Sequence, residues 1–156
     1  FPAELQQTIT AYCNQGGNVL VSGAYVGTDL WDNGEVNVQD LDFAKKVLKY
    51  NWRTGQASVT GDVKSVQSPF RMISGHYEFY NELNEHSYVV ESPDAIEPAD
   101  PACFTIYRYS ENNLSAGVAY KGKYKTCVLG FPIETLKSDE QRDKLMADIL
   151  LFMSSK

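Results

Sequence analysis

The 156-residue sequence is poor in the residues that hold transition metals. It has two histidines and three cysteines, and no two cysteines have the C-x-x-C spacing. This scarcity disfavours a Cys/His zinc site. An odd number of cysteines also defines no disulfide framework, so cysteine usage does not fix a cellular compartment. We expect neither a metal site nor a cofactor.

Long apolar runs and clustered basic charge are also lacking. No run approaches the about 20 apolar residues that a membrane-spanning helix needs, so we expect no membrane span. Lys and Arg number 14 against 20 Asp and Glu, which gives a net charge of −6. Nucleic-acid-binding domains usually carry a basic face. The one basic cluster, at Lys121, Lys123 and Lys125, reads as a solvated hairpin tip, and we expect no nucleic-acid partner.

The chain does have enough apolar material for a core. Hydrophobic residues make up 43% of it and charged residues 22%, within the range of ordinary folded domains. A chain of this length corresponds to one domain. We therefore expect residues 1–156 to form a single α/β domain.

Local patterns indicate where the first and last helices lie. Leu5, Ile9 and Cys13 recur at helical spacing, and the pair Gly16–Gly17 predicts the helix end. Near the C-terminus, Ser138 and Gln141 have the spacing of a capping box. A broad apolar stripe follows and is predicted to pack on a sheet; it consists of Leu145, Met146, Ile149, Leu150, Phe152 and Met153.

Strand patterns lie between these helices. Residues 18–22 are apolar without alternation, which is typical of a strand buried on both faces in a parallel sheet. Residues 104–109 alternate, and residues 115–120 and 124–131 predict a hairpin. Residues 92–102 contain three prolines and predict a surface loop. Together these elements predict a three-layer α/β sandwich with a mostly parallel sheet and a C-terminal antiparallel hairpin.

Two turns have the sequence features of a reaction centre. Residues 23–27 read Gly-Ala-Tyr-Val-Gly directly after the apolar strand, the G-x-X-x-G frame of a nucleophile elbow, which places Tyr25 at its strained centre. Residues 130–135 read Gly-Phe-Pro-Ile-Glu-Thr at the end of the hairpin and include Glu134.

These two motifs, in this order, resemble the class I glutamine amidotransferases, which have a G-x-C-x-G elbow and later a G-x-Q-F-H-P-E-like motif. The resemblance covers residues 4–27 and 115–153 and implies a flavodoxin-like fold. It also implies lost catalysis, because Tyr25 stands at the nucleophilic cysteine and Pro132 at the histidine. Only Glu134 keeps the acidic position.

The amino-acid sequence of residues 16–30 is also similar to that of modules in large secreted bacterial proteins, some of them labelled xanthan lyases. This likeness implies a secreted, periplasmic or cell-surface location. We expect the chain to be a fragment of a longer multidomain protein, with neighbouring domains as partners.

The leading hypothesis is a non-catalytic module that binds a ligand such as a glycan, or packs against neighbouring domains. Its predicted crevice consists of Ser22, Tyr25, Asp29, Trp31 and Glu134. Trp31 offers a flat aromatic face for a sugar ring. Another hypothesis is that the chain serves only to assemble with other domains. This hypothesis predicts a contiguous exposed apolar patch.

Two alternatives assign chemistry to other residues. A hydrolase or lyase acting on polysaccharide or cell wall would use Tyr25, His76 and Glu134. A calcium loop would begin at Asp29, but a tryptophan occupies its third position. The remaining residues of that pattern are Asp32, Asn33, Gly34 and Asp40.

Overall fold

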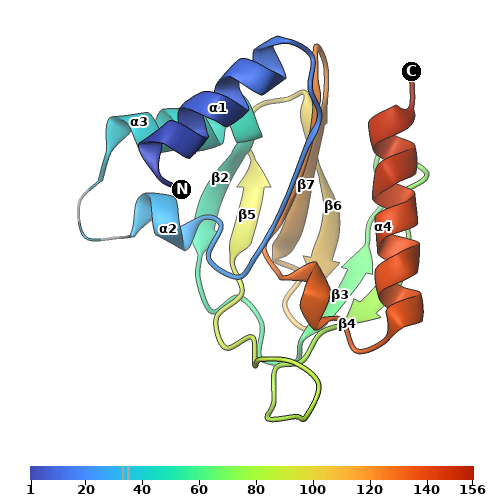
Figure 1. Ribbon diagram of the computed structural model, residues 1–156. Coiled ribbons are helices and arrows are strands. Elements are labelled where there is room, and N and C mark those ends of the chain that lie inside the picture. The colour runs from blue at the N-terminus through green and yellow to red at the C-terminus, as the bar shows by residue number, and fades with distance from the viewer. Residues whose placement is uncertain (33, 35) are drawn as a thin grey trace.

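The computed structural model describes residues 1–32, 34 and 36–156 (Figure 1). Asn33, which belonged to the calcium pattern, lies outside the described residues. The helices are α1 (Ala3–Asn14), α2 (Thr28–Trp31), α3 (Val38–Asp42), the π-helix η1 (Phe43–Leu48), the 3₁₀ helix η2 (Ile133–Thr135) and α4 (Asp139–Ser154). The strands are β1 (Val19–Ser22), β2 (Tyr50–Thr54), β3 (Asp62–Ser65), β4 (His76–Glu78), β5 (Ala95–Pro98), β6 (Cys103–Tyr109), β7 (Ser115–Lys121) and β8 (Lys125–Leu129).

The main sheet is mixed and mainly antiparallel. Its described strands have the order β1-β8-β7-β6-β3-β4, and a separate two-stranded sheet pairs β2 with β5. Among the described strands of the main sheet, only β1 and β8 are parallel neighbours. The predicted three-layer, mostly parallel, flavodoxin-like sandwich is therefore wrong. The C-terminal antiparallel hairpin, β7–β8, is present.

The prediction of a mostly parallel sheet was wrong for a physical reason. Both faces of the central strands are covered, and every residue of β8 is buried. Burial on both faces makes a strand apolar throughout whatever the direction of its neighbours, so the pattern does not distinguish parallel from antiparallel pairing. The strand β1 is an edge strand whose four residues are all half-buried, contrary to the prediction of full burial.

Figure 1 shows α4 on one face of the sheet and α2 with the β2–β5 pair on the other. Each face has its own apolar cluster. On one face α4 packs through Leu145, Ile149 and Phe152. The other face is covered by α2, η1 and the β2–β5 pair, and Ile96 of β5 belongs to the same cluster as Val118 of β7. The predicted surface loop at 92–102 is thus wrong for β5, which lies against the core.

Helix ends follow the local signals. The Ser138 side chain accepts a hydrogen bond from the backbone N–H of Gln141 at 3.1 Å, which confirms the predicted cap. Gly16 has a φ of +90° after α1, the left-handed conformation that ends many helices.

Lys125 is not solvated at a hairpin tip as expected; it is 9% exposed, and its ammonium donates to the carbonyl of Met153 at 2.9 Å. It therefore ties the C-terminus of α4 to the sheet.

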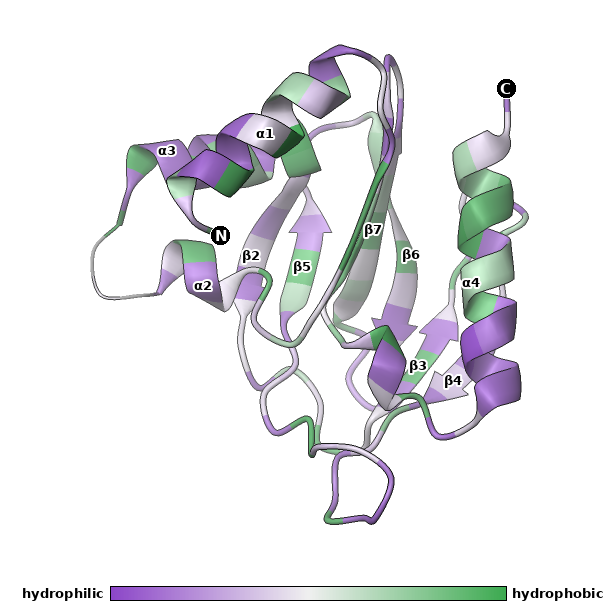
Figure 2. Cartoon of the chain, in the orientation of Figure 1, coloured by the Kyte–Doolittle hydropathy of each residue, from purple (hydrophilic) through white to green (hydrophobic). Residues whose placement is uncertain are grey.

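Hydropathy varies along α4, whose C-terminal half is mostly apolar (Figure 2). Even so, no helix in the described part of the chain is long and apolar enough to cross a membrane.

Candidate functional site

The structure brings together the two turns that the sequence singled out. Because β1 and β8 are parallel neighbours, their carboxyl ends lie at the same edge of the sheet. The Ser22 hydroxyl joins them: it donates to the carbonyl of Phe131 at 3.0 Å and accepts from the N–H of Ile133 at 2.8 Å. Ser22 is consequently held by backbone groups of the segment that leads to Glu134.

Tyr25 lacks the geometry of a nucleophile elbow. Its side chain is 54% exposed, and its φ is not in the left-handed region. Gly23 and Gly27 have no positive φ either, and a Cβ on Gly23 would meet no atom closer than 3.4 Å. Gly27 is needed for a different reason, since its Cβ would lie 2.4 Å from the Trp52 ring. The strained elbow is therefore wrong, and with it the basis for a reacting side chain at Tyr25.

The turn after β1 is organised by a carboxylate that the sequence analysis did not select. Asp94 is fully buried and accepts hydrogen bonds from the backbone N–H groups of Gly27 (2.7 Å) and Thr28 (2.8 Å). It also accepts from the Thr28 hydroxyl at 2.6 Å and the Trp52 indole at 3.1 Å. Burial raises the pKa of Asp94, and the bonds from Thr28, Gly27 and Trp52 oppose that rise.

The backbone of Asp94 is fixed as firmly as its side chain. Its N–H donates to the carbonyl of Gly130 at 2.9 Å, and its carbonyl accepts from the Tyr109 hydroxyl at 2.8 Å. A Cβ on Gly130 would lie 2.0 Å from the Asp94 carbonyl oxygen, so this approach requires glycine. The hydrogen-bond partners of Asp94 all belong to this chain, so Asp94 has a structural role. The sequence analysis did not select it because the prolines around it predicted a surface loop.

Glu134 is held by Tyr88, a residue that the sequence analysis did not select. Its carboxylate accepts a hydrogen bond from the Tyr88 hydroxyl at 2.8 Å. Partial burial, together with that bond and the negative charge of Glu134, raises the pKa of Tyr88 to about 12. Tyr88 is 55% exposed, so the pair lies at the surface with its ring accessible.

Glu134 also lines a surface hollow of about 370 Å³ beside the start of α4. The Tyr80 and His86 rings lie against each other there, with centroids 5.8 Å apart and planes inclined by 30°. Polar and charged side chains surround this pair. The full lining is Tyr80, His86, Ser87, Glu134, Lys137, Ser138, Asp139 and Arg142.

Backbone pairing assembles the hollow from distant segments. The N–H of Tyr80 donates to the carbonyl of Thr135 at 2.9 Å, and the N–H of Lys137 donates to the carbonyl of Glu78 at 2.8 Å. On the other side, the side-chain oxygen (Oδ1) of Asn84 accepts from the backbone N–H groups of His86 and Ser87, each at 2.8 Å. The loop that carries His86 is therefore shaped by an Asx-type turn.

His76 lies away from Tyr25. It is on β4, and β4 and β1 are the opposite edge strands of the main sheet. Its Nε2 contacts the Asp62 carboxylate at 2.7 Å, and the Ser110 hydroxyl donates to the same carboxylate. Partial burial opposes ionisation of Asp62, but the bonds from Ser110 and His76 and the neighbouring positive charge hold its pKa below the usual range. Because one carboxylate lies between a serine and a histidine, this array is no nucleophile–base pair.

Asp29 and Trp31 have structural contacts. The Asp29 carboxylate is 2.5 Å from the amino group of Phe1. The Trp31 ring packs on Tyr50 at 5.8 Å between centroids, and the Lys45 ammonium lies 5.9 Å from its centroid. Asp40 accepts from the Gln6 amide at 2.7 Å. Among the described residues, no group of three or more His, Cys, Asp or Glu side chains is placed to hold a metal ion.

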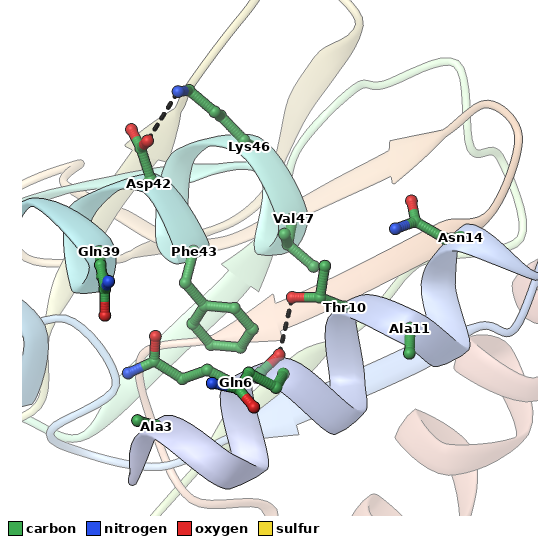
Figure 3. A pocket seen from close by; sticks show the side chains of 11 residues that line it. Ala3, Gln6, Thr10, Ala11, Asn14, Gln39, Asp42, Phe43, Lys46 and Val47 are labelled. Atoms are coloured by element: carbon green, nitrogen blue, oxygen red, sulfur yellow. Dashed lines mark hydrogen bonds and ion pairs between the residues drawn. The ribbon is translucent and has the colours of Figure 1, made fainter.

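A second cavity, of about 530 Å³, lies between α1 and the α3–η1 segment (Figure 3). Its floor includes Phe43 and Val47, and its rim carries amides and the Asp42–Lys46 ion pair at 2.7 Å. The π-helix η1 forms one wall. The buried residues of its lining are Phe43 and Gln6, and the Gln6 amide is already bonded to Asp40. The hollow beside α4 has aromatic and charged side chains in its lining instead, so we place the candidate site there.

The fold is a curled, mixed and mainly antiparallel sheet with few helices, and the hollow is a polar, aromatic site on its surface. The sequence matches no family profile, and it matches no curated protein. Among solved structures, it is similar to the N-terminal domain of mmIFT52, with a TM-score of 0.63 and 14% identity, covering 100% of this chain and 73% of that chain.

It is also similar to the exo-β-1,4-mannosidase Op5Man5 from Opitutaceae bacterium strain TAV5. The TM-score is 0.55 and the identity 11%, and the match covers 99% of this chain and 24% of that chain. Likeness at such low identity concerns the fold alone. Neither the mixed, mainly antiparallel sheet nor these neighbours support the resemblance to class I glutamine amidotransferases, which is therefore corrected.

Proposed function

We propose that the chain is a non-catalytic, glycan-binding module whose site is the hollow beside the start of α4. The observation that carries the proposal is the Tyr80–His86 pair, with the carboxylate of Glu134 and the cations of Lys137 and Arg142 around the same hollow. Sugar rings present apolar C–H faces and many hydroxyl groups. Aromatic faces beside fixed polar groups match that chemistry.

The polar groups of the hollow are held in place. Tyr88 orients Glu134 through the 2.8 Å hydrogen bond. Arg142 donates to the carbonyl of Leu136 and to the carboxylate of Asp139. Side chains fixed before a ligand arrives lose less rotamer freedom on binding, which favours affinity.

We also propose that the chain is part of a longer multidomain protein, and the similarity to Op5Man5 supports this. The match covers about a quarter of a longer chain, Op5Man5, whose name describes action on mannosides. By analogy, this chain serves as an accessory domain of an exported protein, and neighbouring domains are its covalent partners. A secreted, periplasmic or cell-surface location is part of this proposal.

The enzymatic alternative has weaker support. A hydrolase or lyase using Tyr25, His76 and Glu134 needs these groups within hydrogen-bond reach of one substrate. His76 is instead on the opposite edge strand from β1 and contacts Asp62, while Glu134 contacts Tyr88.

The proposal is tested by titrating the isotope-labelled protein with β-1,4-mannopentaose, and separately with cellopentaose, while recording amide NMR spectra. We expect shifts confined to residues around Tyr80, His86 and Lys137. Tyr80→Ala should reduce the affinity at least tenfold, about 1.4 kcal/mol. Tyr12→Ala is the matched control, because Tyr12 is 54% exposed and lies on α1.

Three outcomes count against the proposal. Shifts around Tyr12 or the α1–η1 cavity would place binding elsewhere. The absence of shifts with either sugar at millimolar concentration would show that the protein binds neither β-1,4-mannan nor cellulose oligosaccharides. Shorter oligosaccharides appearing during the titration would overturn the non-catalytic assignment.

A further inference from the structure

A second surface hollow adjoins the one that we assign to glycan binding. It has a volume of about 270 Å³ and is lined by residues of the 80–84 segment and by Lys137. Tyr80 and Lys137 line both hollows, so the two hollows meet at these side chains. A ligand longer than the first hollow would therefore continue into the second by passing Tyr80 and Lys137.

Backbone pairing places Tyr80 and Lys137 on the same side of the chain. Phe79 pairs with Leu136 in an antiparallel bridge, and both residues are fully buried in the core that α4 covers. Side chains alternate along extended backbone, so the neighbours Tyr80 and Lys137 point away from that core. The Tyr80 hydroxyl also donates to the carbonyl of Lys137 at 3.4 Å. The boundary between the two hollows is thus built by the fold.

Side-chain hydrogen bonds hold the loop that borders the second hollow. The Asn84 amide donates to the carbonyl of Glu82 at 2.9 Å, and the Asn81 amide donates to the carbonyl of Val59 at 2.5 Å. These bonds lie on both sides of Leu83, which lines the hollow and is 96% exposed. Leu83 therefore presents an apolar side chain on a loop whose conformation is already set. Such pre-organisation reduces the entropy lost on binding.

The charges around the two hollows disfavour an acidic ligand. The Lys137 ammonium lies 3.1 Å from the Glu78 carboxylate, and Arg142 donates to the carboxylate of Asp139. Both cations of the first hollow therefore already have a carboxylate partner, and Glu82 adds a further carboxylate in the second hollow. An anionic ligand would find no unpaired Lys or Arg in these linings and would meet like charges.

We propose that the two hollows form one extended groove for a neutral oligosaccharide, with one sugar unit at the Tyr80–His86 pair and another against Leu83. This ligand assignment rests on the proposed glycan-binding function and specifies its ligand as a chain of neutral sugars. The Leu83 side chain offers apolar area that the C–H face of a sugar can cover. A chain that fills both hollows gains the second contact within the same binding event, so it should bind more tightly than a short fragment.

Chain length tests the groove. We expect β-1,4-mannopentaose to bind about tenfold more tightly than β-1,4-mannobiose, because only the longer chain reaches both hollows. Titrations of the isotope-labelled protein, followed by amide NMR, give both dissociation constants. The β-1,4-linked pentasaccharide of mannuronic acid has the same linkage with a carboxylate on every unit, and it should bind about tenfold more weakly than mannopentaose.

Leu83→Ser tests the second hollow separately. It should weaken mannopentaose binding about fivefold through the loss of apolar contact, and it should leave binding of mannobiose at the Tyr80–His86 pair unchanged. Leu150→Ser on α4 is the matched control and should change neither constant, because Leu150 is 60% exposed and lines neither hollow. The apolar stripe of α4 predicted core positions for Leu150 and for Met146, which is 37% exposed, so that prediction is wrong for these two residues.

The possible outcomes distinguish the groove from the proposed function. If none of the sugars binds, the proposed function itself fails, and the groove fails with it. If mannobiose and mannopentaose bind equally well, or if Leu83→Ser leaves the affinity for mannopentaose unchanged, the first hollow remains the glycan site but the extended groove is refuted. Equal binding of the mannuronic acid chain would refute the preference for neutral sugars.

Discussion

At the scale of single residues, Asp94 decides the shape of the turn after β1. Its carboxylate is the acceptor for donors from the adjacent residues Gly27 and Thr28 and from Trp52, which lies in a separate part of the chain. A buried donor left without an acceptor costs about 1–3 kcal/mol. Asp94 is therefore a strong determinant of stability despite its charge.

We expect Asp94→Ala to destabilise the protein by more than about 3 kcal/mol, since it leaves several buried donors unpaired and opens a small cavity. Asp94→Asn should cost less, because its carbonyl oxygen can still accept from the backbone N–H groups of Gly27 and Thr28. Urea unfolding measures both free energies. Equal losses for the two variants would show that the carboxylate acceptors do not matter individually.

At the scale of elements, the β1–α2 turn has the spacing of an elbow but a different physical basis. Gly27 is fixed by the contact with Trp52, whose ring lies 2.4 Å from the position of a Cβ, whereas a Cβ on Gly23 would make only an ordinary contact with Val26 at 3.4 Å. A glycine motif thus arises here from packing and from hydrogen bonds to Asp94, without left-handed backbone conformations.

This difference predicts unequal effects of two alanine substitutions. Gly27→Ala should lower stability by about 1–3 kcal/mol, because an added methyl group is forced against the Trp52 ring. Gly23→Ala should be neutral or stabilise by up to about 1 kcal/mol, since it restricts the unfolded chain without strain. Thermal unfolding of both variants is the measurement. A larger loss of stability for Gly23→Ala than for Gly27→Ala would contradict this account and favour a strained elbow.

At the scale of the whole molecule, the main sheet lies between two cores and couples them. Leu145 of α4 belongs to one core, whereas Trp31 packs on the other. Because β7 and β8 contribute side chains to both cores, we expect one cooperative unfolding transition.

Leu145→Ala should cost about 2–5 kcal/mol, the usual range for a buried leucine. Since Trp31 and Trp52 both lie on the opposite face from α4, their fluorescence reports the distant core. We expect the fluorescence midpoint in urea to shift together with the circular dichroism midpoint. A fluorescence midpoint unchanged by Leu145→Ala would mean that the two cores unfold separately.

The candidate site was predicted only in part. Ser22 and Glu134 were selected from the two motifs, and the structure joins their segments through the Ser22 hydroxyl. Tyr80 and His86 lay in a segment without clear periodicity, so sequence reasoning did not connect them with Glu134. The pairing of the 78–80 and 135–137 backbones, which unites them, joins residues far apart in the chain.

Features that depend on neighbours a few residues away could be predicted from the amino-acid sequence. The Ser138 cap, the Gly16 helix end and the β7–β8 hairpin follow from local hydrogen bonds and backbone preferences. Tertiary structure alone decided strand direction, the edge position of β1 and the burial of Asp94. These depend on which distant surfaces cover each face of the sheet, and a buried strand looks the same in sequence whichever way its neighbours run.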